Sequence, residues 1–209
     1  MIGPIKTVEM HTGGEPLRII TGGIPLPEGL TLLEKRRHLR QEADKYRRFL
    51  MLEPRGHRDM YGALIVPADD DSADFGVIFM HNEGYSTMCG HAVIALTKCA
   101  VEAGVVPQTG EVTQVIIDVP CGQIHAKAIA PDFPNNNIIT KVCFDSVPSF
   151  VFANKQSVEV DGIGTVNFDI AFGGAFYAYV QASSLALTLA PVNQSKIIDY
   201  GKRIKDAVI

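Results

Sequence analysis

Short runs of alternating apolar and polar residues cover most of the chain, and most of them are bounded by Gly, Pro or Asp. A period of two is typical of β-strands that bury one face, and regularly spaced short strands favour a curled antiparallel sheet or a barrel. The runs that predict strands are 6–10, 17–21, 62–67, 76–81, 114–119, 123–129, 141–144, 150–153, 157–160, 165–172 and 176–182.

Two segments near the ends of the chain follow helical spacing instead. Residues 31–50 begin with Thr31 and Glu34, which have the spacing of a capping box. A second helix is expected after Asn193, which is a suitable N-cap residue. The apolar positions that share one face of the first helix are Leu32, Leu39, Ala43, Tyr46 and Leu50.

A third helical segment, residues 87–103, is apolar on almost every side and stops at Gly104. A helix with only a narrow polar stripe must be nearly enclosed by other elements. We therefore predict an α+β fold in which a curled antiparallel β-sheet surrounds this central helix.

Pro and Asn residues interrupt the alternating pattern at 130–140, which makes this segment the best linker candidate. The sequence thus suggests two domains. The first covers residues 1–139 and contains the central helix, and residues 140–209 form the opening part of a second, truncated domain.

Composition excludes several classes of partner. The chain has 209 residues, 46% of them hydrophobic, and a formal net charge of −4, which gives no electrostatic reason to expect nucleic acid or an anionic membrane. We expect a cytoplasmic protein, because no signal peptide or membrane-spanning run is evident. The four cysteines, Cys89, Cys99, Cys121 and Cys143, form no C-x-x-C pair, so we expect free thiols and no metal site.

The position of Cys89 in the sequence suggests a catalytic role. With Ser86 or Thr87 as the cap of the central helix, Cys89 falls in the first turn, where unpaired backbone N–H groups and the helix dipole favour an anion. We expect this environment to lower the pKa of the thiol and to make it a useful base or nucleophile. Gly90 would let a ligand approach the helix-end amides, and His91 would either bind that ligand or be satisfied by a backbone carbonyl.

Five segments in order, "MHTGGEPLRII", "EPRGHRDMYGALIVP", "GYSTMCGHAVIAL", "VPSFV" and "DIAFGGAFYAYV", resemble the proline racemase family, and the likeness extends from about Val8 to Val180. Within that family the sequence is most similar to the animal branch that dehydrates trans-3-hydroxy-L-proline. The resemblance implies a fold related to diaminopimelate epimerase, in which two similar domains each wrap a sheet around a helix and hold the substrate between them.

The resemblance also implies the chemistry. A cysteine at the helix start removes the Cα proton of a cyclic amino acid without any cofactor. In racemases a second cysteine acts on the opposite face, whereas in the dehydratase that position is a threonine and loss of the 3-hydroxyl yields 1-pyrroline-2-carboxylate. Carried over to this chain, Cys89 is the catalytic base, and Gly90 and His91 bind substrate. The expected partner is this small molecule, with a homodimer allowed.

The family segment that supplies the second half of the site has no match in these residues, so we expect a truncated isoform that is inactive alone. Two alternatives stay open: a proline or 4-hydroxyproline racemase or epimerase, and a non-catalytic fragment that self-associates through exposed strands. A cysteine hydrolase using Cys89 and His91 is disfavoured, because residues two apart on a helix do not face each other.

Overall fold

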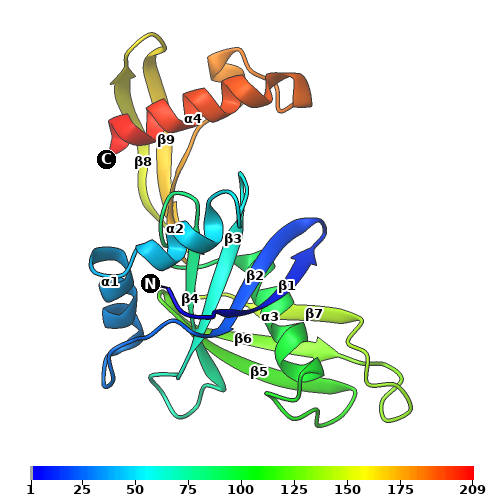
Figure 1. Cartoon of the computed structure of the whole chain (residues 1–209). Coiled ribbons are helices and arrows are strands. Elements are labelled where there is room, and N and C mark those ends of the chain that lie inside the picture. The colour runs from blue at the N-terminus through cyan, green and yellow to red at the C-terminus, as the bar shows by residue number, and fades with distance from the viewer. Residues whose placement is uncertain (1) are drawn as a thin grey trace. The chain divides into compact units, whose positions relative to one another are not determined.

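The computed structural model describes residues 2–209, which divide into two compact units, one that ends at Val147 and one that spans Pro148–Ile209 (Figure 1). Within the described residues the first unit contains β1 (Lys6–Thr12), β2 (Glu15–Gly22), α1 (Leu32–Gln41), α2 (Lys45–Met51), β3 (Tyr61–Val66), β4 (Phe75–His81), α3 (Gly90–Glu102), β5 (Val112–Val119), β6 (Gly122–Ile129) and β7 (Lys141–Asp145). The second contains β8 (Phe150–Val160), β9 (Gly164–Phe172), β10 (Phe176–Tyr179), two 3₁₀ turns (Ala182–Leu185 and Pro191–Asn193) and α4 (Gln194–Val208).

The sheet of the first unit has its strands in chain order, from β1 to β7. Parallel neighbours need a crossover connection, and the two crossovers contain the helices of this unit: α1 and α2 lie between β2 and β3, and α3 lies between β4 and β5. The antiparallel pairs are β1–β2, β3–β4, β5–β6 and β6–β7, and the parallel pairs are β2–β3 and β4–β5.

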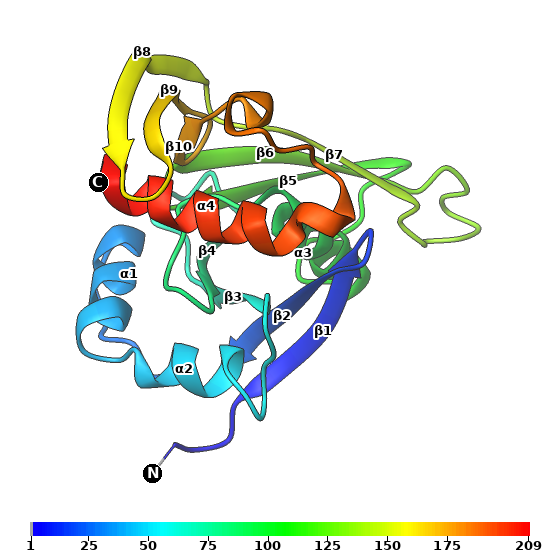
Figure 2. The same ribbon diagram turned by 90° about the horizontal axis from the view of Figure 1, so that it is seen from above.

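The sheet curls around α3. This helix contacts β1 and β2 at one end of the strand order and β6 and β7 at the other, which a flat sheet would not allow (Figures 1 and 2). The predicted α+β fold with a curled sheet around a central helix is therefore confirmed, and two parallel pairings are added to the expected antiparallel ones.

The two faces of β4 supply two separate cores. Phe75, Val77 and Phe79 pack in the cluster that includes α3, whereas Ile78 and Met80 pack in the cluster formed with α1 and α2. Because side chains alternate between faces along a strand, one buried strand serves both sides of the sheet.

The helix predicted over 31–50 is two helices, α1 and α2, with an interruption between Gln41 and Lys45. The predicted capping box is present: the amide of Glu34 donates to Thr31 Oγ1 at 3.3 Å, and the amide of Thr31 donates to Glu34 Oε2 at 2.9 Å. The buried face is the predicted one, since Leu32, Leu39, Ala43, Tyr46 and Leu50 all lie in the cluster with β4.

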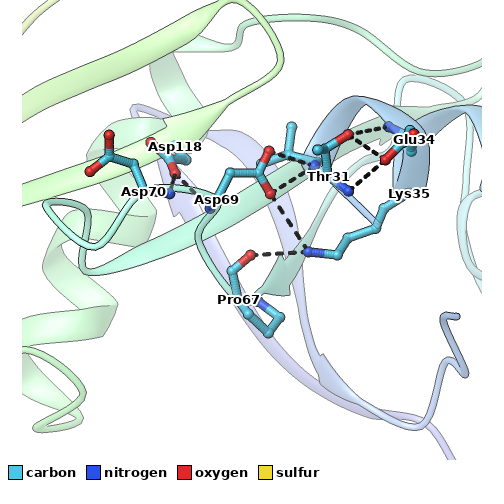
Figure 3. Close-up of polar contacts among 8 residues, drawn as sticks. Thr31, Glu34, Lys35, Pro67, Asp69, Asp70 and Asp118 are labelled. Carbon is cyan, nitrogen blue, oxygen red and sulfur yellow. Dashed lines mark hydrogen bonds and ion pairs between the residues drawn. The ribbon is translucent and has the colours of Figure 1, made fainter. Parts of the chain in front are cut away.

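The carboxylates of Asp69 and Asp118 connect the start of α1 to the sheet through hydrogen bonds (Figure 3). Both oxygens of Asp69 accept from the amide of Leu32, at 2.9 and 2.7 Å, and Lys35 Nζ lies 3.8 Å from Asp69 Oδ1. Asp118 Oδ2 on β5 in turn accepts from the amides of Asp69 and Asp70, at 2.9 and 3.2 Å. The loop before β4 is thereby held to β5 at one end and to α1 at the other.

We expect Asp118→Ala to reduce the free energy of unfolding by about 2 kcal/mol. The side chain of Asp118 is buried, and its loss leaves the amides of Asp69 and Asp70 without this acceptor. Urea unfolding followed by circular dichroism measures this loss. Asp71→Ala, at an exposed position in the same loop, is the matched control and should stay within about 0.5 kcal/mol of the wild type. Equal losses in both variants would contradict the role given to Asp118.

The sequence placed a linker at 130–140 and a domain boundary after residue 139. The structure instead makes this segment a loop between two neighbouring antiparallel strands, β6 and β7, and divides the chain after Val147. The reason is the pairing of β7, which adds five residues to the sheet of the first unit. A Pro- and Asn-rich composition indicates a loop but does not distinguish a hairpin connection from a linker.

The second unit consists of the sheet β10–β9–β8 and helix α4. Val160 and Val166 of the sheet and Ile204 of α4 form its buried cluster. The helix begins after Asn193, as predicted, although the Asn193 side chain donates to the carbonyl of Thr188 and does not cap the helix.

Candidate active site at the start of α3

Cys89 is the N-cap residue of α3 and not part of its first turn. Its backbone is extended, with φ −152° and ψ 109°, and the helix begins at Gly90. The predicted cap at Ser86 or Thr87 was wrong. Ser86 has another role, since its hydroxyl is hydrogen-bonded to the hydroxyl of Tyr61 on β3.

The thiol of Cys89 contacts the imidazole of His91. Cys89 Sγ lies 3.2 Å from His91 Nδ1 and 3.9 Å from Nε2. From the sequence we expected no such contact, because residues two apart within a helix do not face each other. This expectation was wrong here, because the extended backbone of an N-cap residue turns its side chain back over the helix start.

Burial raises the pKa of the Cys89 thiol. The residue is 8% exposed, and removal from water disfavours the thiolate. The backbone amides of Ala92 and His91 and the Tyr61 hydroxyl favour the thiolate, although neither amide reaches the geometry of a capping hydrogen bond. The lowered pKa expected from the helix start is therefore a wrong prediction for this structure: the helix-end effect is present, and burial exceeds it.

Gly90 has a packing role besides the one proposed from sequence. A Cβ at this position would lie 3.3 Å from Phe144 Cζ on β7, which is tighter than ordinary contact. On the other side, the carbonyl of His91 accepts a hydrogen bond from Thr12 Oγ1 at 2.8 Å. The start of α3 is thus held between β1 and β7, the two outer strands of the curled sheet.

Sequence reasoning missed Tyr61, Thr12, Glu15 and Phe144. Tyr61 packs edge-on against the His91 ring at 5.0 Å between centroids, and the negative charge of Glu15 acts on the thiol. Thr12 and Glu15 flank the "GG" turn of the segment "HTGGEP", which carries family likeness but no local sign of this contact. Strand pairing brings these residues together, and no spacing along the chain signals it.

In this chain the exposed thiol of Cys143 should react first with iodoacetamide at neutral pH, and Cys89 should react slowly. Cys89 is buried and its pKa is raised by that burial, so both access and thiolate fraction are low. Peptide mapping after brief labelling measures the order, with labelling in urea as the control that makes all four thiols accessible. Faster labelling of Cys89 than of Cys143 would contradict the burial of this site.

The proline racemase family model matches residues 7–209. The chain belongs to this family. It is 62% identical over 205 residues to the trans-3-hydroxy-L-proline dehydratase of Colwellia psychrerythraea, a match that covers 98% of this chain and 57% of that protein. It is 48% identical over 207 residues to the human trans-3-hydroxy-L-proline dehydratase, covering 98% of this chain and 58% of the human protein. The chain thus spans less than two thirds of the length of these relatives.

Solved structures with the same fold agree with this membership. A hydroxyproline epimerase from Agrobacterium vitis with bound trans-4-hydroxy-L-proline has a TM-score of 0.90 at 28% identity and covers 98% of this chain and 59% of its own. A probable proline racemase from Agrobacterium radiobacter with bound carbonate has a TM-score of 0.89 at 29% identity, over 97% of this chain and 59% of its own. Within residues 2–209, no helix combines the length and the apolar character that crossing a bilayer requires.

Proposed function

We propose that this chain carries the catalytic cysteine of a trans-3-hydroxy-L-proline dehydratase. The observation that supports it most strongly is the 62% identity with a relative of that name over 98% of the chain. In the proposed reaction the Cys89 thiolate takes the Cα proton, the 3-hydroxyl leaves as water once protonated, and the resulting enamine tautomerises to 1-pyrroline-2-carboxylate. The reaction consumes no oxidant or reductant, because the only net change is loss of water.

Burial of Cys89 suits this role. A Cα proton beside a carboxylate is only weakly acidic, so its removal needs a strong base in a place from which water is excluded. The raised pKa of the Cys89 thiol means that its thiolate, once formed, binds a proton more tightly than an ordinary thiolate does. The amides at the start of α3 would hold the substrate carboxylate, with Gly90 and His91 as the binding residues.

The chain spans 57% of the Colwellia relative. We therefore assign the activity not to this chain alone but to a protein in which the chain is joined to the part of the Colwellia relative that it does not match. The test is a chimera of these two parts, incubated with trans-3-hydroxy-L-proline and followed by proton NMR. We expect 1-pyrroline-2-carboxylate from the chimera and no turnover from the chain alone. Failure of a folded chimera to release water would reject the proposal.

The same assay separates the dehydratase from a proline or 4-hydroxyproline racemase or epimerase. The epimerase with a solved structure is 28% identical to this chain, whereas the dehydratases are 48% and 62% identical. We therefore expect no D-proline from L-proline in deuterated water. Formation of D-proline without dehydration of the hydroxylated substrate would favour the other branch. The cytoplasmic location and the homodimer stay predictions.

A further inference from the structure

Tyr61 connects the segment before Cys89 to the first turn of α3. It is the first residue of β3 and pairs with His81 at the end of β4, and the two rings stack with 5.7 Å between centroids. The same phenol ring meets the His91 imidazole edge-on at 5.0 Å. Its hydroxyl is hydrogen-bonded to Ser86. The side chain of Tyr61 therefore contacts one residue before Cys89 in the sequence, Ser86, and one residue after it, His91.

The groups around the thiol act on its ionisation in opposite directions. Burial disfavours the thiolate, and so does the negative charge of Glu15 at the start of β2. The hydroxyl of Tyr61 and the backbone amides of His91 and Ala92 favour it. His91 also places Nδ1 at 3.2 Å from the sulfur. In a site where burial disfavours the charged form, removing one donor should visibly move the titration of Cys89.

We propose that Tyr61 is a positioning residue for Cys89: its hydroxyl donates a hydrogen bond to the thiolate while its ring holds the His91 imidazole beside the sulfur. A phenolic hydroxyl has one proton to donate and can accept as well, so this arrangement makes Ser86 the donor to Tyr61. The contribution of Tyr61 to catalysis rests on the proposed function of Cys89, whereas its effect on the thiol does not.

The test measures ionisation and not turnover. In protein labelled with carbon-13 at the cysteine Cβ atoms, the Cys89 resonance is identified by its loss in Cys89→Ser and followed from neutral to alkaline pH. Tyr61→Phe keeps the ring and removes the hydroxyl, and the titration midpoint should rise by about one pH unit. Ser86→Ala removes the hydrogen bond between Ser86 and the Tyr61 hydroxyl, and a smaller rise in the same direction is expected.

The matched control is Tyr46→Phe, which removes a phenolic hydroxyl from a buried residue in the core on the other face of the sheet. Its midpoint should equal that of the wild type. An unchanged midpoint in folded Tyr61→Phe would overturn the proposal, and if that variant does not fold, an unchanged midpoint in Ser86→Ala overturns it. A raised midpoint together with an inactive chimera would support the role of Tyr61 and reject the proposed dehydratase function.

Discussion

Replacing Cys89 with serine should abolish dehydration of trans-3-hydroxy-L-proline by the chimera, with a loss of at least about 10³-fold in kcat. An alcohol is a far weaker acid than a thiol, so the serine hydroxyl would provide almost no anion to take the Cα proton. The substitution should not destabilise the start of α3, because serine is among the preferred N-cap residues and Cys89 occupies the N-cap position. The readout is product formation by proton NMR, with exchange of the Cα hydrogen in deuterated water as a second measure.

The matched control for this variant is Cys143→Ser, which alters an exposed thiol on β7 and should retain the activity of the parent chimera. Thermal unfolding of Cys89→Ser should occur at or above the parent temperature, which separates lost chemistry from lost structure. Undiminished turnover in Cys89→Ser would show that another group removes the proton, and the site at the start of α3 would then need a different function.

Leu96→Ala should lower the free energy of unfolding of the first unit by about 3 kcal/mol, or roughly 6 to 12 °C in Tm. Leu96 lies on the central helix and is 1% exposed, inside the cluster that the curled sheet encloses. The strands that contact α3 on opposite sides are fixed by their own pairing, so they cannot close fully over the space left by the lost side chain. Thermal unfolding followed by circular dichroism measures the change.

Leu33→Ala provides the comparison, since it makes the same chemical change at a helical position of α1 that is 52% exposed. Little apolar surface is lost there, so Tm should change by no more than about 2 °C. If the two variants lose the same stability, α3 is not the enclosed core helix that its sequence and its contacts indicate.

The local pattern located nearly all of the regular structure. Each predicted strand run overlaps an observed strand, although the run 176–182 extends beyond the end of β10 at Tyr179, and the central helix begins at Gly90 and not at 87 as predicted. The runs 150–153 and 157–160 are parts of one strand, β8, whose register shifts near Lys155 at a φ of 51°. Sequence patterns did not show this, because a polar interruption in a strand and a turn between two strands have the same composition.

At the site, the sequence by itself determined that Cys89 stands at the start of an enclosed helix, because the apolar run and the glycine that ends it are local signals, although the cap indicated at Ser86 or Thr87 was wrong. Only the tertiary structure decided the direction of its pKa shift, since burial depends on the whole fold. It alone also brought Tyr61 and Thr12 to the helix start, 25 and 79 residues from their partners Ser86 and His91. Periodicity reports which face of an element is buried, whereas strand pairing and sheet curvature decide which distant residues meet there.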